Sequence, residues 1–241
     1  MRIPTHIDRK LEEREEANKL RTLRTGLPGQ IDFCSNDYLG LSQHPDRNKI
    51  KKQFFGAESR AGSGGSRLIS GNHALYIQAE THMAAFFQSE DALLFNSGYD
   101  ANLGIFSSIP QKGDTVIYDE WCHASIRDGI RLSHARSVKF KHNNLMDLRK
   151  KMEAAEGNIY IALESVYSMD GDLAPLAGVN RLAEEFGAYV ILDEAHSAGL
   201  EYLDSVFEKE QQNCFIRMLG LGKAWGTHGG MILCSPEPRI T

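Results

Sequence analysis

Short apolar runs alternate with amphipathic stretches along most of the chain. The apolar runs cover residues 92–95, 115–118, 137–140, 158–163, 189–192, 215–219 and 231–234. Runs of this length that end in turn residues are typical of strands buried on both faces of a parallel sheet. The stretches at residues 96–108, 143–155 and 176–186 have helical spacing. The pattern therefore predicts an α/β fold, a mostly parallel sheet with helices on both faces.

The first third of the chain has a less regular pattern. Residues 6–24 combine strong helix formers with mixed charges at i, i+4 spacing, which predicts an exposed helix. Residues 31–41 suggest a short strand and a polar turn. The glycine-dense residues 61–71 are either a flexible linker or a loop that lines a cleft, and helical spacing resumes at residues 76–87. We expect an N-terminal helical arm of residues 1–30 and one large domain of residues 31–241.

Composition excludes several classes of protein. The net charge of −5 argues against a nucleic-acid partner. No apolar run approaches the length of a membrane span, and the charged N-terminus contains no apolar signal region. The four cysteines are far apart and form no C-x-x-C pair, so we expect reduced thiols and no bound metal. These observations favour a cytoplasmic protein with neither nucleic acid nor membrane as partner.

Polar residues follow several predicted strands directly. They are Asn96 and Ser97, Asp119 and His123, Glu164 and Ser168, and Asp193 and His196. Ligands of open parallel sheets collect outside the carboxyl ends of the strands, so topology predicts that these residues share one rim. The polar turn at residues 96–99 precedes a helix, and a helix N-terminus can hold a phosphate group. A simple helix cap is the alternative explanation of this turn.

This rim suits a cofactor that combines a pyridine nitrogen, a phenolic oxygen, a phosphate and an aldehyde. Such a cofactor needs a carboxylate at the ring nitrogen, a donor at the phenolic oxygen and a lysine for a Schiff base. Asp193, His196 and Lys223 are candidates for these tasks, and His123 is a candidate for an aromatic lid. Taken singly, each has a simpler explanation: a helix cap, a core or surface histidine, or a solvated lysine.

Taken together, several runs resemble the α-oxoamine synthases. The runs are residues 33–41, 62–66, 96–102, 119–125, 164–172, 193–196 and 222–224. The resemblance implies the aspartate aminotransferase fold, which is fold type I of the pyridoxal-phosphate enzymes, with residues 31–241 as its cofactor-binding large domain. It also implies a C-terminal small domain that this chain lacks, so we expect a truncated member of the family.

The resemblance also implies catalytic roles. Lys223 would form the Schiff base with pyridoxal 5'-phosphate and remove the α-proton of the bound amino acid. Asp193 would pair with the ring nitrogen and His123 would stack on the ring. His196 would approach the phenolic oxygen.

The remaining implied roles concern binding. Ser168 would approach the phenolic oxygen together with His196. The turn Ser97, Gly98 and Tyr99 would contact the phosphate, and Asn36 would face the substrate carboxylate.

The implied reaction is a decarboxylative condensation in a homodimer. Its expected substrates are L-alanine and an acyl thioester, pimeloyl-CoA or pimeloyl-carrier protein, and its product is 8-amino-7-oxononanoate of biotin biosynthesis. Members of the family that make 2-amino-3-ketobutyrate, 5-aminolevulinate or 3-ketosphinganine share much of the pattern and remain open.

A catalytically impaired chain that binds the cofactor weakly, or pairs with a full-length partner, is a further alternative. It is favoured by Gly220, which stands where the family carries a threonine that binds phosphate, and by residues 199–219, which depart from the family pattern. A helicase or NTPase motif at residues 193–196 is disfavoured, because Gly222 and Lys223 are followed by Ala224 and form no P-loop.

Overall fold

A computed structural model of the chain describes residues 3–23, 25–26, 29–55, 62–200, 210–211 and 213–234. The chain divides into two compact units, Met1–Ser35 and Asn36–Thr241. The expected division at residue 30 stays a prediction. Of the stretch at residues 199–219, only residues 199–200, 210–211 and 213–219 lie in the described part.

The first unit contains helix α1 (Thr5–Glu16), which confirms the first part of the helix expected at residues 6–24, whereas residues 17–23 are not helical. None of its residues is buried, and Arg9 and Glu13 form an i, i+4 ion pair of 3.3 Å. The strand predicted within residues 31–41 is wrong, because residues 31–40 form bends, turns and irregular backbone and Leu41 begins a short 3₁₀ helix. Ile31 and Phe33 are exposed there, so no apolar face drives these residues into a sheet.

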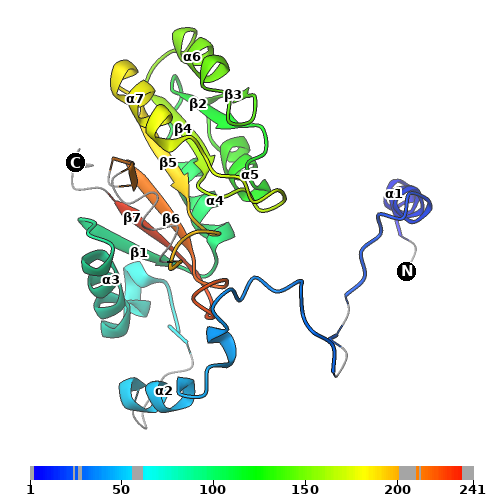
Figure 1. Cartoon of the computed structure of the whole chain (residues 1–241), viewed down its shortest axis with the longest axis vertical. Helices are drawn as coiled ribbons and strands as arrows, with labels where there is room; N and C mark the ends of the chain where they lie inside the picture. Colours follow the sequence, from blue (N-terminus) through cyan, green and yellow to red (C-terminus); the bar gives the residue numbers. More distant parts are fainter. Residues whose placement is uncertain are drawn as a thin grey trace. The chain divides into compact units, whose positions relative to one another are not determined.

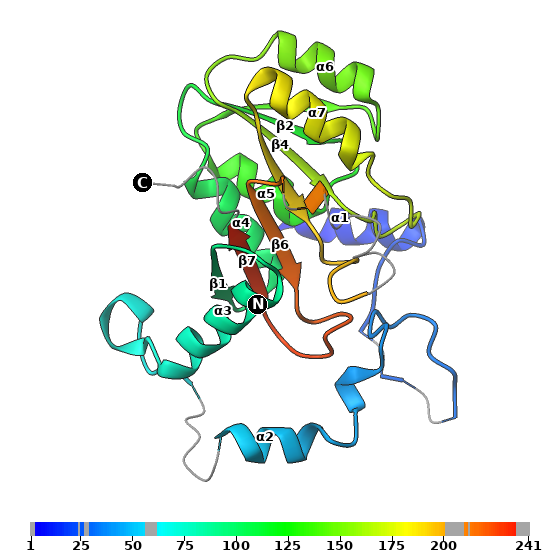
Figure 2. The ribbon, with the colours of Figure 1, turned by 60° about the vertical axis from the view of Figure 1, so that its left-hand side comes forward.

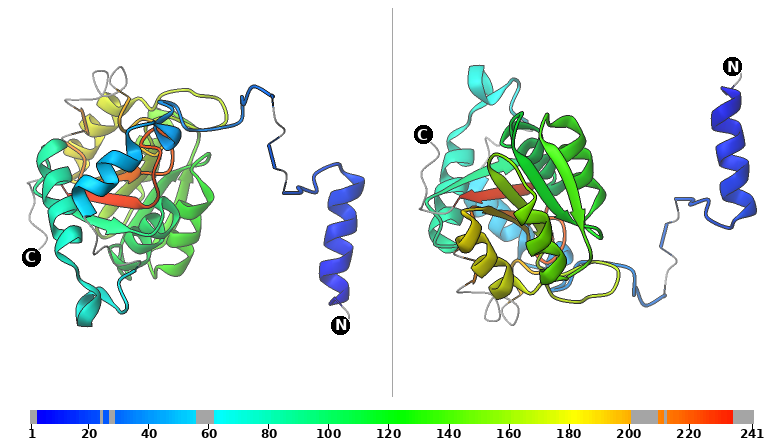
Figure 3. Two further views of the ribbon diagram at one scale, coloured as in Figure 1. Left: turned by 90° about the horizontal axis from the view of Figure 1, so that it is seen from below. Right: turned by 90° about the horizontal axis from the view of Figure 1, so that it is seen from above.

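The second unit contains a seven-stranded sheet in the order β1-β7-β6-β5-β4-β2-β3 (Figure 1). Its strands are β1 (Asp91–Phe95), β2 (Thr115–Asp119), β3 (Arg136–Phe140), β4 (Ile159–Glu164), β5 (Tyr189–Asp193), β6 (Ile216–Gly220) and β7 (Gly230–Cys234). Only β7 runs antiparallel to its two neighbours, and it lies inside the sheet (Figure 3). The predicted mostly parallel sheet is confirmed.

Helices cover both faces of this sheet (Figures 1 and 2). Helices α4 (Gly98–Ser108) and α5 (Ala124–Leu132) pack on one face, and α6 (Leu145–Glu153) and α7 (Leu176–Phe186) pack on the other. Helix α3 (Ala74–Phe86) packs beside β1 and β7. Three further elements precede it: η1 (Leu41–Gln43), α2 (Arg47–Phe55) and the π-helical turn η2 (Arg67–Gly71).

Alternate residues of the central strands enter different cores, as strand geometry requires. Ile161 and Leu192 pack with α6 and α7, whereas Ala162 and Ile191 pack with α4 and α5. Both faces are therefore apolar, which explains why these strands appear in the sequence as continuous apolar runs. Among the described helices, none is long and apolar enough to cross a membrane.

Candidate active site

A cavity of about 310 Å³ lies at the rim where β4, β5 and β6 end and β7 begins. The strand register brings these strand ends together. Glu164 at the end of β4 pairs with Asp193 at the end of β5, and Gly220 at the end of β6 pairs with Gly230 at the start of β7. The polar residues that line the cavity include Asn96, Ser97, Tyr99, Asn102, His123, Ser125, Glu164, Asp193, His196, Lys223 and His228. Of the eight residues predicted to share this rim, six line the cavity, whereas Asp119 and Ser168 are not among the lining residues.

Asp193 lies at the buried base of the cavity. Its Oδ2 accepts a hydrogen bond of 2.8 Å from Asn102 Nδ2, and its Oδ1 accepts one of 2.9 Å from the Ala195 backbone N–H. Burial raises the pKa of Asp193, while these two donors and the charges of Lys223 and His123 lower it in part. The carboxylate is therefore costly to bury and is supported by specific partners.

A chain of hydrogen bonds links Asp193 to His123. Asn102 Nδ2 also donates to Ser125 Oγ at 2.9 Å, and Ser125 Oγ lies 2.8 Å from His123 Nδ1. The Ser125 backbone N–H donates to the same Nδ1 at 3.2 Å. Since Nδ1 accepts, the neutral ring carries its proton on Nε2. The Tyr99 ring stands edge-on to His123, with centroids 6.1 Å apart.

Lys223 and His196 face each other in the cavity. Lys223 Nζ lies 2.5 Å from His196 Nε2, and His196 Nδ1 lies 2.7 Å from the Tyr38 hydroxyl. Tyr38 donates in turn to Asn36 Oδ1 at 3.1 Å. Because that proton is committed to Asn36, Tyr38 accepts from Nδ1–H, which leaves Nε2 as the acceptor for Lys223.

The charges of these two residues follow from their burial. Burial, with the charges of Lys223 and His123, lowers the pKa of His196 to about 4, so the ring is neutral at physiological pH. Burial also lowers the pKa of Lys223, against the carboxyl groups of Asp193 and Glu164, which raise it. A lysine with a lowered pKa is a better nucleophile at neutral pH.

The turn between β1 and α4 forms another wall. Ser97 is the N-cap of α4, and its Oγ accepts the Asp100 backbone N–H at 3.0 Å. A Cβ atom at Gly230 would lie 2.6 Å from the Gly98 nitrogen, so glycine permits β7 to approach this turn closely. Tyr99 donates its hydroxyl to the Asp128 carboxylate. The expected phosphate turn thus borders the cavity.

Two predicted site residues are not among those that line the cavity. Ser168 is exposed on the hairpin closed by the bridge between Val166 and Leu173. Asn36 reaches the site only through Tyr38. The implied roles of both residues stay predictions.

Sequence reasoning missed the part that Asn102, Ser125, Tyr38 and His228 have in the site. Asn102 and Ser125 lie inside helices, where a polar residue on an otherwise buried face was the available signal.

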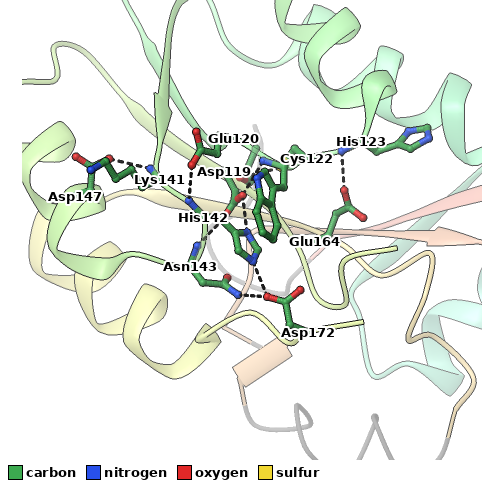
Figure 4. A network of polar contacts seen from close by, with 12 residues as sticks. Asp119, Glu120, Cys122, His123, Lys141, His142, Asn143, Asp147, Glu164 and Asp172 are labelled. Carbon is green, nitrogen blue, oxygen red and sulfur yellow. Dashed lines mark hydrogen bonds and ion pairs between the residues drawn. The ribbon is translucent and has the colours of Figure 1, made fainter. Parts of the chain in front are cut away.

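A second polar network lies beside the cavity and holds the loop that leads to His123 (Figure 4). His142 Nδ1 lies 3.0 Å from Asp119 Oδ1, and its Nε2 lies 2.5 Å from Asp172 Oδ2. The Trp121 ring stacks on His142 at 3.8 Å. Burial alone would lower the pKa of His142, but the carboxylates of Asp172 and Asp119 outweigh it and raise the pKa.

Comparison with known proteins gives consistent matches. Residues 28–240 match the family described as aminotransferase class I and II. The chain is 39% identical to an 8-amino-7-oxononanoate synthase of Emericella nidulans, covering 94% of this chain and 60% of that protein. It is 37% identical to a mitochondrial 2-amino-3-ketobutyrate coenzyme A ligase of Mus musculus, covering 88% of this chain and 52% of that protein.

Solved structures give the same result. A serine palmitoyltransferase of S. paucimobilis with bound PLP and myriocin has a TM-score of 0.81 and 28% identity, covering 96% of this chain and 65% of that one. An 8-amino-7-oxononanoate synthase of Francisella tularensis has a TM-score of 0.69 and 29% identity, covering 86% and 59%. The chain thus spans about two thirds or less of the length of these proteins. The predicted resemblance to the α-oxoamine synthases is confirmed.

Proposed function

The chain belongs to the aminotransferase class I and II family, and from this premise we propose that it binds pyridoxal 5'-phosphate in the cavity at the sheet rim. The observation that carries the proposal is the joint presence of Asp193 and Lys223 in the lining of one cavity. Asp193 offers a buried carboxylate and Lys223 a primary amine, the two groups that such a cofactor requires at its ring nitrogen and its aldehyde.

The other lining residues fit the remaining parts of the cofactor. The exposed His123 ring, held by Ser125, would lie against the pyridine ring. The N-terminus of α4 at Ser97 and Gly98 would hold the phosphate through backbone N–H groups. Neutral His196 would face the phenolic oxygen. When bound, the cofactor supplies an electron sink for the charge that develops at the substrate α-carbon.

Lys223 would act both as the covalent attachment point and as the base for the α-proton. His196 Nε2 accepts from Lys223 Nζ at 2.5 Å, so the amine is oriented before any ligand arrives. Hydrogen bonds between His196 and Tyr38 and between Tyr38 and Asn36 connect the Lys223 amine to the residue that we expect to face the substrate carboxylate.

For the reaction, we propose the decarboxylative condensation of L-alanine with a pimeloyl thioester to 8-amino-7-oxononanoate. Support comes from several relatives of that name, at 36–42% identity in four of them. A cytoplasmic homodimer is proposed with it. The mouse 2-amino-3-ketobutyrate coenzyme A ligase and the serine palmitoyltransferases favour a second candidate, the condensation of another amino acid with another acyl thioester.

The first test concerns the cofactor. Wild-type protein mixed with pyridoxal 5'-phosphate should show a red-shifted cofactor absorbance. After borohydride reduction, mass spectrometry should locate the cofactor on Lys223. Lys223→Ala should lose both signals, whereas Lys151→Ala, a control in α6, should keep them. A wild-type spectrum identical to that of the free cofactor contradicts the proposal.

The second test concerns the substrates. Release of the free thiol, CoA or the carrier protein, should be measured with L-alanine and pimeloyl-CoA or a pimeloyl-carrier protein. Glycine with acetyl-CoA and L-serine with palmitoyl-CoA serve as comparison pairs. Faster release with either comparison pair moves the assignment to the second candidate.

A further inference from the structure

Among the carboxyl groups that line the cavity, Glu164 has no task in the function proposed above. It is the last residue of β4 and is only 4% exposed. Register places it directly beside Asp193 of β5. Since neighbouring in-register residues point to the same face of a sheet, both carboxyl groups lie on the side of α4 and α5.

Glu164 makes a short contact to the loop that carries His123. Its Oε1 accepts the backbone N–H of His123 at 2.6 Å, and Figure 4 shows the carboxyl group directed at that backbone. The His123 side chain is exposed, so close packing does not fix it. Hydrogen bonds therefore determine its position: Ser125 holds the ring and Glu164 holds the main chain.

We propose that Glu164 is a positioning residue: its carboxyl group holds the His123 backbone and thereby sets where the imidazole ring lies over the cavity. The inference rests on the proposed function for its effect on the cofactor. The contact to His123 belongs to the free protein and can be tested without any ligand.

The charge environment indicates which form of Glu164 performs this task. Burial, with the nearby charge of Asp193, raises the pKa of Glu164 to about 8, although the His123 N–H and Lys223 lower it in part. Asp119 at the end of β2 raises it slightly. At neutral pH the group is therefore a carboxylic acid whose carbonyl oxygen accepts the N–H. Glutamine reproduces this neutral acceptor, whereas leucine removes it.

Besides Asp119, the titratable groups around Glu164 include Asp193, Lys223 and the His123 ring in the cavity lining. Two more are Cys122, on the same loop as His123, and His196, after β5. Burial raises the pKa of Cys122 well above its usual value, and the pKa of His196 is lowered to about 4. Neither group titrates near pH 8. Because the pKa of Lys223 is lowered and the His123 ring lies beside its own amide, a transition near pH 8 at that amide is assigned to Glu164 by its absence in Glu164→Gln.

The experiment compares the full chain as wild type, Glu164→Gln, Glu164→Leu and the control Glu120→Gln. Glu120 is a suitable control because it lies on the same loop and accepts the His142 backbone N–H instead. Without cofactor, the His123 amide resonance should shift with a midpoint near pH 8 in wild type and Glu120→Gln. In Glu164→Gln this transition should be absent.

With pyridoxal 5'-phosphate at pH 7, Glu164→Gln should bind within about threefold of wild type. Glu164→Leu should bind about tenfold more weakly, the effect expected from one lost hydrogen bond. An amide transition that persists in Glu164→Gln overturns the proposal, and so does wild-type affinity in Glu164→Leu. If wild type fails to bind the cofactor, the proposed function fails, and the amide titration still decides the role of Glu164.

Discussion

Replacing Arg217 should reveal how much the buried ion pair between Arg217 and Glu194, next to the site, contributes to the free energy of unfolding. Glu194 follows Asp193, so its side chain points to the opposite face of the sheet. There, Arg217 Nε donates to both carboxylate oxygens of Glu194 at 3.1 and 3.0 Å, and Nη2 donates to Oε2 at 2.9 Å. Arg217 also lies 5.3 Å from the centroid of the Phe87 ring.

The magnitude follows from burial. Glu194 is 0% exposed and Arg217 is 7% exposed, so water cannot replace a lost partner. Breaking a buried ion pair by removal of one member costs about 3–5 kcal/mol. The free energy of unfolding of a domain is about 5–15 kcal/mol, so Arg217→Met should remove a large fraction of it. Arg217→Lys keeps the charge but not the planar fork, and should cost less, about 1–2 kcal/mol.

The assay is urea unfolding followed by tryptophan fluorescence, for Arg217→Met, Glu194→Gln and the double variant. Because the double variant also removes the buried carboxylate charge that Arg217 balances, it should be more stable than Arg217→Met, with a coupling energy of about 2–3 kcal/mol. Arg217→Met should also weaken cofactor binding, since Glu194 lies between Asp193 and His196. A coupling energy below about 0.5 kcal/mol would refute the reasoning.

Three further changes test other parts of the site. Gly220→Thr should destabilise the chain by about 1–3 kcal/mol in urea unfolding, because its Cβ would lie 2.9 Å from Ala195 Cβ; unchanged stability would show that the strand end relaxes. The raised pKa of His142 means that its own contribution to stability should be lost as pH rises above about 6.5, so the difference in urea midpoint between wild type and His142→Gln should be larger at pH 6 than at pH 8.5. The lowered pKa of His196, about 4, has the opposite sign: its own contribution to stability should be lost as pH drops from about 6.5 to 4, and a difference in urea midpoint between wild type and His196→Gln that stays constant over this range would contradict it.

The local pattern of apolar runs and the polar residues that follow them was sufficient to predict the sheet and most of the polar residues at its rim. The strands at residues 158–163 and 189–192 were predictable because both of their faces are buried, which requires continuous apolar runs. Asp193, His123 and Lys223 were predictable as candidates because each directly follows a predicted strand or stands close to one. The structure of residues 31–41 was not predictable in this way, because a short run with apolar residues becomes a strand only where a sheet edge is available to pair with it.

The sequence by itself determined which residues end the strands, and only the tertiary structure decided which of them meet. The antiparallel insertion of β7 between β1 and β6 brings the turn at residues 96–99 close to Lys223. Asn102 reaches Asp193 across 91 positions, and Tyr38 reaches His196 across 158. Such contacts depend on strand order and helix placement, which arise from the summed burial of the whole core and not from any local period. The same cause leaves Ser168 on an exposed hairpin and places Glu164 against the backbone of His123.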